Sequence, residues 1–239
     1  MTAANAIDPR ALALTCLSEA SVDAKLELTA GASAAIACPG PWLDSLGGDP
    51  CPSMPEPGRP EQPLLVAPRE LPQRKLNSVE GRAALIHAVA HIEFNAINLA
   101  WDALYRFPGM PQDYYRDWAS VAADEARHFS LLQARLAQLG YQYGDFPAHN
   151  GLWQAAVATE HDVMVRMALV PRVLEARGLD VTPGMIERLR RVGDHDTIAA
   201  LELILREEVR HVAIGSRWFA YLCEQRRLDA QSTFLDLLR

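Results

Sequence analysis

Apolar residues recur at helical spacing along most of the chain, and no stretch alternates apolar and polar residues as a half-buried strand does. Ser78 is a capping residue for the first long helix, and Gly140 is a typical end for the second. Helices are predicted from about residue 79 to a break at 107–111, then at 112–139, 152–178, 182–191, after 194, and from 228. The predicted fold class is all-α, with four long helices in a bundle.

The first third of the chain has a different character. Asp8 and Pro9 form a helix start, and a helix is predicted at 11–28. Residues 31–74 contain ten prolines, which exclude a long helix and indicate an extended arm. We therefore expect residues 1–75 to pack, as a helix and a proline-rich arm, on a bundle formed by residues 76–239.

Charged and imidazole side chains interrupt the apolar stripes of three predicted helices. These residues are Glu93 in the first long helix, Glu125 and His128 in the second, and Glu208 and His211 in the last. A charge at such a buried position is costly unless it is paired or bound to a metal. These side chains are therefore candidate metal ligands.

A Glu-x-x-His motif occurs twice, as Glu125 with His128 and as Glu208 with His211. Residues three apart lie on one helix face, about 4.5 Å apart along the axis, so the carboxylate and the imidazole can bind one ion together. One such motif arises by chance in roughly a third of chains of this length. Two copies are more specific.

Each motif follows another glutamate at nearly equal distance. Glu93 lies 32 residues before the first motif, and Glu175 lies 33 residues before the second. One Glu from each of two helices and one Glu-x-x-His from each of two others is the pattern of a four-helix carboxylate site for two metals. Because Glu175 is close to the predicted helix end at Gly178, Asp162 and Glu160 are alternative ligands on that helix.

The types of ligand predict which metal ions the site would bind. Four carboxylates match the charge of two divalent cations, and oxygen with imidazole nitrogen suits two iron ions, with manganese as the alternative. The predicted roles are bridging and catalytic for Glu125 and Glu208, terminal for Glu93 and Glu175, and one imidazole per ion for His128 and His211. Neighbouring charges that can support these ligands are Asp124, Arg127, Glu207 and Arg210.

Composition and charge limit the partners and the cellular compartment that we expect for this protein. The 239 residues carry a net charge of -7, which argues against broad binding to nucleic acids or anionic membranes. The four cysteines show no close pairing and no signal peptide is recognised, so a cytoplasmic protein with reduced thiols is expected. No apolar run approaches the length of a membrane span. A monomer or a small homo-oligomer is expected.

Several segments resemble a known family. They are His91-Ile92-Glu93, the break at 107–111, the run at 124–129, the loop at 143–153, and the runs at 175–180 and 208–212. Over roughly residues 8–225 the chain resembles a bacterial ferritin-like family of unknown function. The resemblance implies a ferritin-like bundle with no settled activity. The runs around Glu125 and Glu175 are also similar to a di-iron hydroxylase that acts on a modified adenosine of tRNA.

The expected function is a di-iron oxygenase or oxidase that uses dioxygen to oxidise an organic substrate, such as a small molecule or a modified nucleoside. Iron handling, as a ferroxidase, storage protein or peroxide-removing protein, is the alternative, followed by a structural metal site. The substrate pocket is expected near His149 or beneath the proline-rich arm. His87 is a weaker ligand candidate, and His161 is a candidate for the pocket mouth.

Overall fold

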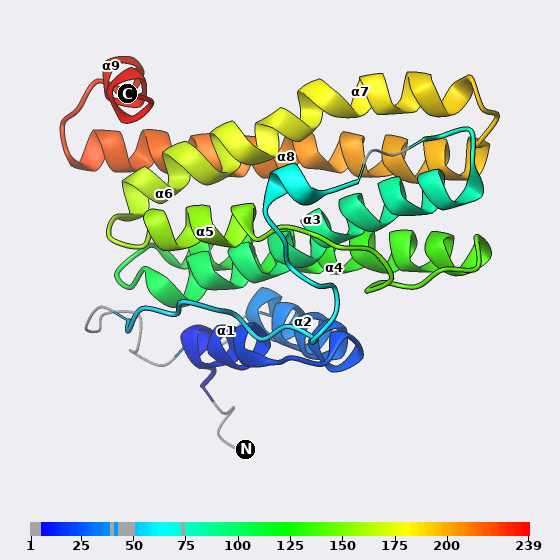
Figure 1. Ribbon diagram of the computed structural model, residues 1–239. Helices are drawn as coiled ribbons and strands as arrows, with labels where there is room; N and C mark the ends of the chain where they lie inside the picture. Colours follow the sequence, from blue (N-terminus) through cyan, green and yellow to red (C-terminus); the bar gives the residue numbers. More distant parts are fainter. Residues whose placement is uncertain (1–5, 39–40, 43–50, 73–74) are drawn as a thin grey trace.

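The computed structural model describes residues 6–38, 41–42, 51–72 and 75–239. Within these residues the chain forms helices and two isolated bridges, Ile7 with Trp42 and Leu65 with Ala148, and no strand. The all-α bundle predicted from the apolar pattern is therefore confirmed. Figure 1 shows α1 and α2 on one side of the α3–α4 pair, with α7 and α8 on the other side.

The N-terminal region contains two helices where one was predicted. Helix α1 spans Pro9–Ser18, with the Asp8 side chain accepting hydrogen bonds from the first free backbone N–H groups. Helix α2 spans Val22–Ala37 and is capped by Ser21, which starts a new helix because its hydroxyl accepts from Ala24 N. The arm thus begins after Ala37 and not at residue 31. Part of the predicted arm, residues 39–40, 43–50 and 73–74, lies outside the described residues.

The central pair follows the prediction closely. Helix α3 spans Val79–Arg106, capped by the Ser78 hydroxyl, and α4 spans Gln112–Gln138. Gly140 has a φ of 82°, the left-handed conformation that ends a helix at low cost only in glycine. The two helices pack along their length through the apolar stripes, and this interface places Glu93 and Glu125 in the bundle interior.

The predicted third helix is divided into four pieces. Helix α5 spans Gly151–Ala158, α6 spans Val163–Leu169, a π-helical turn labelled η3 spans Val170–Glu175, and α7 spans Ala176–Arg190. The predicted end at Gly178 and the predicted start at Thr182 are wrong, because α7 runs through both and packs on α8. The kink predicted at Pro171 takes the form of the π-helical turn, which accommodates a residue without an N–H.

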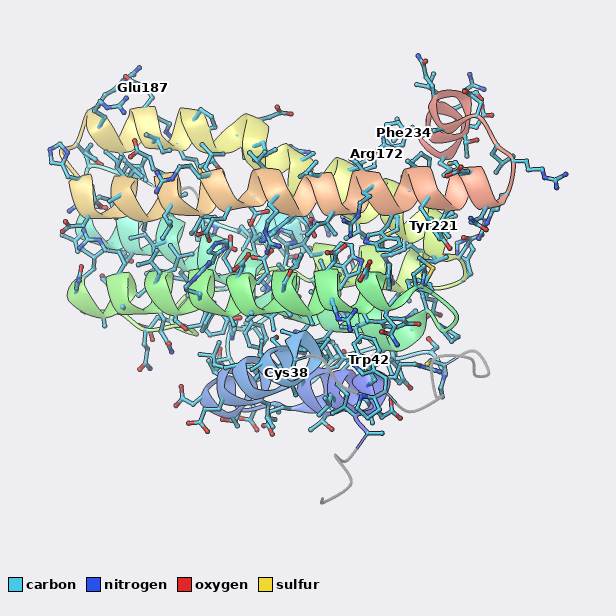
Figure 2. The ribbon with its side chains drawn as sticks, turned by 180° about the vertical axis from the view of Figure 1, so that it is seen from behind. Cys38, Trp42, Arg172, Glu187, Tyr221 and Phe234 are labelled. Carbon is cyan, nitrogen blue, oxygen red and sulfur yellow. The ribbon has the colours of Figure 1, made fainter. Side chains whose placement is uncertain are left out.

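The last long helix, α8, spans His195–Gln225, and the short α9 spans Ala230–Leu237. Helix α9 is held to the bundle by Arg172 of η3, whose guanidinium lies 4.5 Å from the ring centroid of Phe219 and 3.9 Å from that of Phe234. Figure 2 shows Arg172 and Phe234 beside each other at this end of the molecule. The C-terminal helix therefore contacts the same π-helical turn that carries Glu175.

The described part of the arm is joined to the helices by backbone hydrogen bonds. Gly58 N donates to Leu17 O of α1 over 2.8 Å, and Val66 N donates to Ala148 O over 2.8 Å. Trp153 Nε1 donates to Pro55 O over 2.9 Å. A short 3₁₀ turn, η2, spans Pro68–Glu70. The arm consequently contacts α1, α5 and the loop that follows α4.

The sequence predicts no apolar run of membrane-spanning length, but α3 is long and apolar enough, by length and composition alone, to cross a membrane. In the bundle, 83% of its most apolar window is buried against other helices. A central core helix has the same composition for this reason. The four cysteines form no disulfide.

Candidate metal centre

The candidate ligands come from four elements of the bundle. Helix α3 supplies Glu93, α4 supplies Glu125 and His128, η3 supplies Glu175, and α8 supplies Glu208 and His211. Both imidazoles are fully buried, and Glu125 is 1% exposed. Each Glu-x-x-His pair points inward because residues three apart share the apolar face of an amphipathic helix.

The ligand atoms of the first half of the site are close together. Suitable atoms of Glu93, Glu125, His128 and Glu208 all lie within 4.8 Å of one another. His128 Nδ1 is 3.3 Å from a carboxylate oxygen of Glu93, 3.3 Å from one of Glu125 and 3.6 Å from one of Glu208. Three carboxylates from three helices thus converge on one imidazole nitrogen.

The second half is arranged around His211. Its Nδ1 is 2.9 Å from Glu125 Oε1 and 3.3 Å from Glu208 Oε1. Glu125 and Glu208 therefore each approach both imidazoles, whereas Glu93 approaches only His128 among the described ion-pair contacts. This is the placement expected of two carboxylates that lie between two ions, with a third at one end.

Glu175 is not among the four residues whose ligand atoms lie within 4.8 Å of one another, but it feels the charges of the cluster. Its Oε2 is buried and makes no hydrogen bond with any described residue, and the charges that act on it most are those of Glu208 and Glu125. The alternatives for this helix are engaged elsewhere. Asp162 caps α6 and pairs with Arg226, and Glu160 accepts from Arg106. Of the three residues considered, Glu175 is the one whose carboxyl group is influenced by the charges of Glu208 and Glu125.

Both imidazoles donate their outer N–H to a carboxylate of the neighbouring helix. His128 Nε2 on α4 lies 2.6 Å from Glu207 Oε2 on α8, and His211 Nε2 on α8 lies 3.2 Å from Asp124 Oδ2 on α4. The two contacts are reciprocal, since each acid directly precedes the glutamate of a motif. A carboxylate acceptor at Nε2 leaves Nδ1 facing the centre of the cluster as the ligand atom.

Two arginines hold these outer carboxylates. Arg127 donates to Glu207 over 2.8 Å and to Asp124 over 2.8 Å, so that it joins α4 to α8. Arg210 donates to Asp124 and, over 3.0 Å, to the Ser120 hydroxyl. The four charged residues that flank the motifs therefore form an ion-paired layer between the cluster and solvent.

Without a bound cation, the neighbouring carboxylates favour the protonated, positively charged form of both imidazoles. Burial by itself would lower the pKa of His128, but its contacts with Glu125 and Glu93 outweigh burial and raise the pKa to about 11. Asp124 and Glu125 in the same way outweigh burial at His211 and raise its pKa to about 12. Both rings would lose a proton on binding a cation at Nδ1.

Most of the carboxyl groups, in contrast, are shifted toward their neutral form, because burial and neighbouring carboxylates raise their pKa values. Burial, followed by repulsion from Glu208 and Glu125, raises the pKa of Glu175 to about 8. Burial and the charge of Glu125 also raise the pKa of Glu93 well above its ordinary value. At Glu125 burial favours the neutral acid, but the two imidazoles outweigh it and hold the pKa well below the usual range. The cluster thus concentrates more negative charge than the imidazoles neutralise.

The buried acidic and histidine side chains form a donor set that could hold a metal ion. Among the described residues, His211 Nδ1 and Glu175 Oε2 are buried and have no hydrogen-bond partner of good geometry, although His211 Nδ1 lies 2.9 Å from Glu125 Oε1. Buried polar atoms are rarely left unpaired in native proteins unless water or an ion satisfies them. Four carboxylates and two neutral imidazoles are also the usual donor set of two-metal carboxylate bundles. The residues present are therefore suited to hold metal.

The whole bundle matches a single family model. Residues 18–239 match the family described as protein of unknown function (DUF455). The chain belongs to the DUF455 family. It is also 52% identical over 186 residues to an uncharacterized protein of Haemophilus influenzae, an alignment that covers 75% of this chain and 65% of that protein. No solved structure gives a significant match.

The family match confirms the resemblance to a family of unknown function, and the ferritin-like relationship of this DUF455 protein stays a prediction. The other histidines have separate partners. His87 Nε2 accepts from Gly144 N over 3.0 Å, and His149 Nδ1 accepts from Gly151 N over 3.1 Å. His161 lies in the turn before α6, away from the convergent carboxylates. The weaker ligand role considered for His87 is therefore not supported.

Proposed function

We propose that this DUF455 protein holds two iron ions in the cluster and uses them to activate dioxygen for the oxidation of an organic substrate. Glu125 and Glu208 would bridge the ions. Glu93 and His128 would complete one site, and Glu175 and His211 would complete the other. Manganese fits the same oxygen and nitrogen ligands and is the alternative metal.

One observation supports this proposal above the others. Glu125 and Glu208 each lie within 3.6 Å of the inner nitrogen of both imidazoles. A single structural ion needs one set of about four ligands. Two carboxylates placed between two imidazoles, with a further carboxylate at each end, instead match a two-metal arrangement.

When bound, reduced iron would supply electrons and coordination positions for dioxygen. The chain's own residues set the conditions for that chemistry. Glu207 and Asp124 accept from the outer imidazole nitrogens and hold the rings in the orientation that presents Nδ1. Burial of the ligands keeps bulk water from the reacting atoms. Hydroxylation would place one oxygen atom in the substrate and release the other as water, with two electrons from an external reductant and two protons from solvent.

The proposal also covers the substrate class, the partners, the compartment and the domain organisation. The substrate would be a small organic molecule or a modified nucleoside, and nucleic acid and membrane partners are not expected for a chain with a net charge of -7. We propose a cytoplasmic monomer or small homo-oligomer. Residues 1–75 would pack as an accessory unit on the bundle at 76–239.

Elemental analysis of protein purified without added metal tests the proposal most directly. About two iron or manganese ions per chain are expected, from the ligand count of such bundles. Glu125→Ala and His211→Ala should each abolish metal binding and any reductant-dependent dioxygen uptake. His195→Ala provides the matched control, because His195 is an exposed histidine at the start of the same helix as His211.

The same measurements separate the alternatives. Oxidation of excess ferrous iron without an organic substrate, together with a large shell in sedimentation, would favour iron handling. Stoichiometric zinc with no response to reductant would favour a structural site. Absence of any bound metal after loading with iron, manganese or zinc would refute the metal centre itself.

A further inference from the structure

A pocket of about 330 Å³ lies where the C-terminal helix α9 packs on α8 and η3. Mostly apolar side chains line it, among them Phe219 and Ala220 of α8 and Phe234 and Leu235 of α9. Beneath the proline-rich arm, where the sequence predicts a pocket, the cavity is only about 10 Å³, which admits about one water-sized group. The pocket at α9, in contrast, has the size and the apolar lining of a small-molecule site.

Arg172 of η3 is the one cation among the residues that line this pocket. Its Nη1 is buried and has no hydrogen-bond partner among the described residues. Burial lowers the pKa of the guanidinium, and no carboxylate is among the groups that shift it. Other half-buried arginines, such as Arg82 and Arg135, pair with Asp194. Arg172 thus carries a positive charge in a partly desolvated position without an acidic partner.

Two aromatic rings hold the Arg172 guanidinium at the pocket. The guanidinium carbon lies 4.5 Å from the ring centroid of Phe219 and 3.9 Å from that of Phe234, and Figure 2 shows Arg172 and Phe234 beside each other. Such contacts use the faces of the rings, which attract the cation but do not replace an oxygen acceptor for its N–H groups. The position of the cation is therefore set, and its capacity to donate hydrogen bonds is left over.

The acids of the C-terminal segment are engaged elsewhere. Asp229 caps α9, where its side chain accepts from a backbone N–H over 2.8 Å, and Asp236 pairs with Arg239 at 3.0 Å. The pocket itself offers the uncharged oxygens of Ser216 and Gln231 and no carboxylate. A neutral oxygen or a water molecule does not neutralise the cation, and apolar walls give water few partners. The pocket therefore complements an anion that has an apolar body.

We propose that this pocket binds a small organic acid, with its carboxylate on Arg172 and its apolar body against Phe219 and Phe234. A carboxylate matches the forked donors of a guanidinium and would supply the acceptor that Arg172 lacks. An aromatic or short aliphatic body would cover the two rings and the side chain of Leu235, which is 51% exposed.

None of the six candidate metal ligands lines this pocket, so the proposal does not rest on the function proposed for the metal centre. A ligand in the pocket would join η3, α8 and α9, and it would stabilise the folded chain by mass action. At a ligand concentration one hundred times Kd, the thermal midpoint of a chain of this size should rise by about 5–10 °C.

The test uses the full chain with benzoate and hexanoate, at constant ionic strength. Ligand-observed NMR should show saturable binding of at least one of these acids, and the thermal midpoint should rise with the acid that binds. Benzamide and hexanamide, which keep the shape without the charge, should bind about tenfold more weakly. Acetate, which keeps the charge without the apolar body, should also bind more weakly. The relative affinity for benzoate and hexanoate identifies the body as aromatic or aliphatic.

Two variants remove the two features of the site separately. Arg172→Met should weaken binding of the acid about 10- to 100-fold, because the charged donor is lost. Arg177→Met, which removes an exposed arginine of α7 outside the pocket, should bind like the unmodified chain. Ala220→Leu fills the pocket from an exposed position of α8 and should abolish binding without lowering the thermal midpoint of the unliganded chain. Its control is Ala213→Leu, at an exposed alanine two turns earlier on the same helix.

The Ala220→Leu pair keeps the test decisive if Arg172→Met, which also loses its contacts with two rings, fails to fold. The proposal is overturned if neither acid binds to the unmodified chain, or if the amides bind as tightly as the acids. It is also overturned if Ala220→Leu or a folded Arg172→Met binds like the unmodified chain, or if either variant loses no more affinity than its control.

Discussion

Gly215 of α8 tests how the π-helical turn positions Glu175. A methyl group added at this glycine would lie 2.3 Å from Pro171 Cγ and 2.4 Å from Pro171 Cβ. The contact between Gly215 and Pro171 therefore lies one helical turn from His211 on α8 and one turn from Glu175 on η3.

The distances at Gly215 give the displacement that an added methyl group would require. Ordinary carbon contacts begin near 3.4 Å, so Gly215→Ala requires η3 and α8 to separate by about 1 Å (3.4 − 2.3). Overpacking of this kind costs about 1–3 kcal/mol. In a chain of this length that corresponds to a fall of roughly 2–12 °C in the thermal midpoint. Because Glu175 follows Pro171 on the same turn, it should move away from His211 together with the backbone.

Two assays separate packing from metal binding. Calorimetry should show the loss of stability, and elemental analysis should show metal content reduced from about two ions per chain toward about one. The ion held by Glu93 and His128 should remain, because those ligands belong to α3 and α4. An extra methyl at Gly184 of α7 meets no atom within 4 Å, so Gly184→Ala is the control and should leave both properties unchanged or improve stability.

The reasoning fails if Gly215→Ala retains the thermal midpoint and metal content of the unmodified chain. It also fails if Gly184→Ala produces the same losses. A destabilised Gly215→Ala protein with full metal content would leave the packing argument intact, but it would remove Glu175 from the ligand set.

Three further predictions concern other contacts. Glu207→Gln should weaken metal binding about 10- to 100-fold, because the charged acceptor of His128 Nε2 is lost, and a competition assay with a chelator measures this change. Asp102→Ala should lower the free energy of unfolding by about 3–5 kcal/mol in urea titration, since it leaves the guanidinium of Arg166, 1% exposed, without its carboxylate. Burial lowers the pKa of Lys25 to about 8, so the unfolded chain binds more protons between pH 8 and 10.5, and stability should rise by about 1 kcal/mol from pH 8 to 9. A Lys25→Met variant should lack this rise, and an equal rise in that variant would show that another group is responsible.

The parts of the fold that depend on local pattern were predictable. The limits of α3 and α4 follow from apolar periodicity, the Ser78 cap and the left-handed Gly140, all of which act within a few residues. The all-α class follows from the same periodicity. The division of the N-terminal helix was missed, although Ser21 is an ordinary capping residue and Asp23 follows it in the first turn.

The third helix shows where local signals fail. Gly178 and Pro183 are usually found at helix boundaries, yet α7 continues through both because one face packs on α8 for its whole length. The π-helical turn at Pro171 depends on Gly215, forty-four residues away, whose missing side chain admits the proline ring. No short window of sequence contains both members of such a contact.

For this protein, the sequence by itself determined which side chains are candidates for metal binding, because the i, i+3 spacing places Glu and His on one buried helix face. Tertiary structure decided how they are used. Packing of α4 against α8 sets the reciprocal contacts of Asp124 with His211 and of Glu207 with His128, and thereby the nitrogen that faces the centre. It also leaves Asn98 Nδ2 buried and without a hydrogen-bond partner among the residues that the structure describes. Such contacts join residues far apart in the chain, and their geometry exists only once the helices have packed.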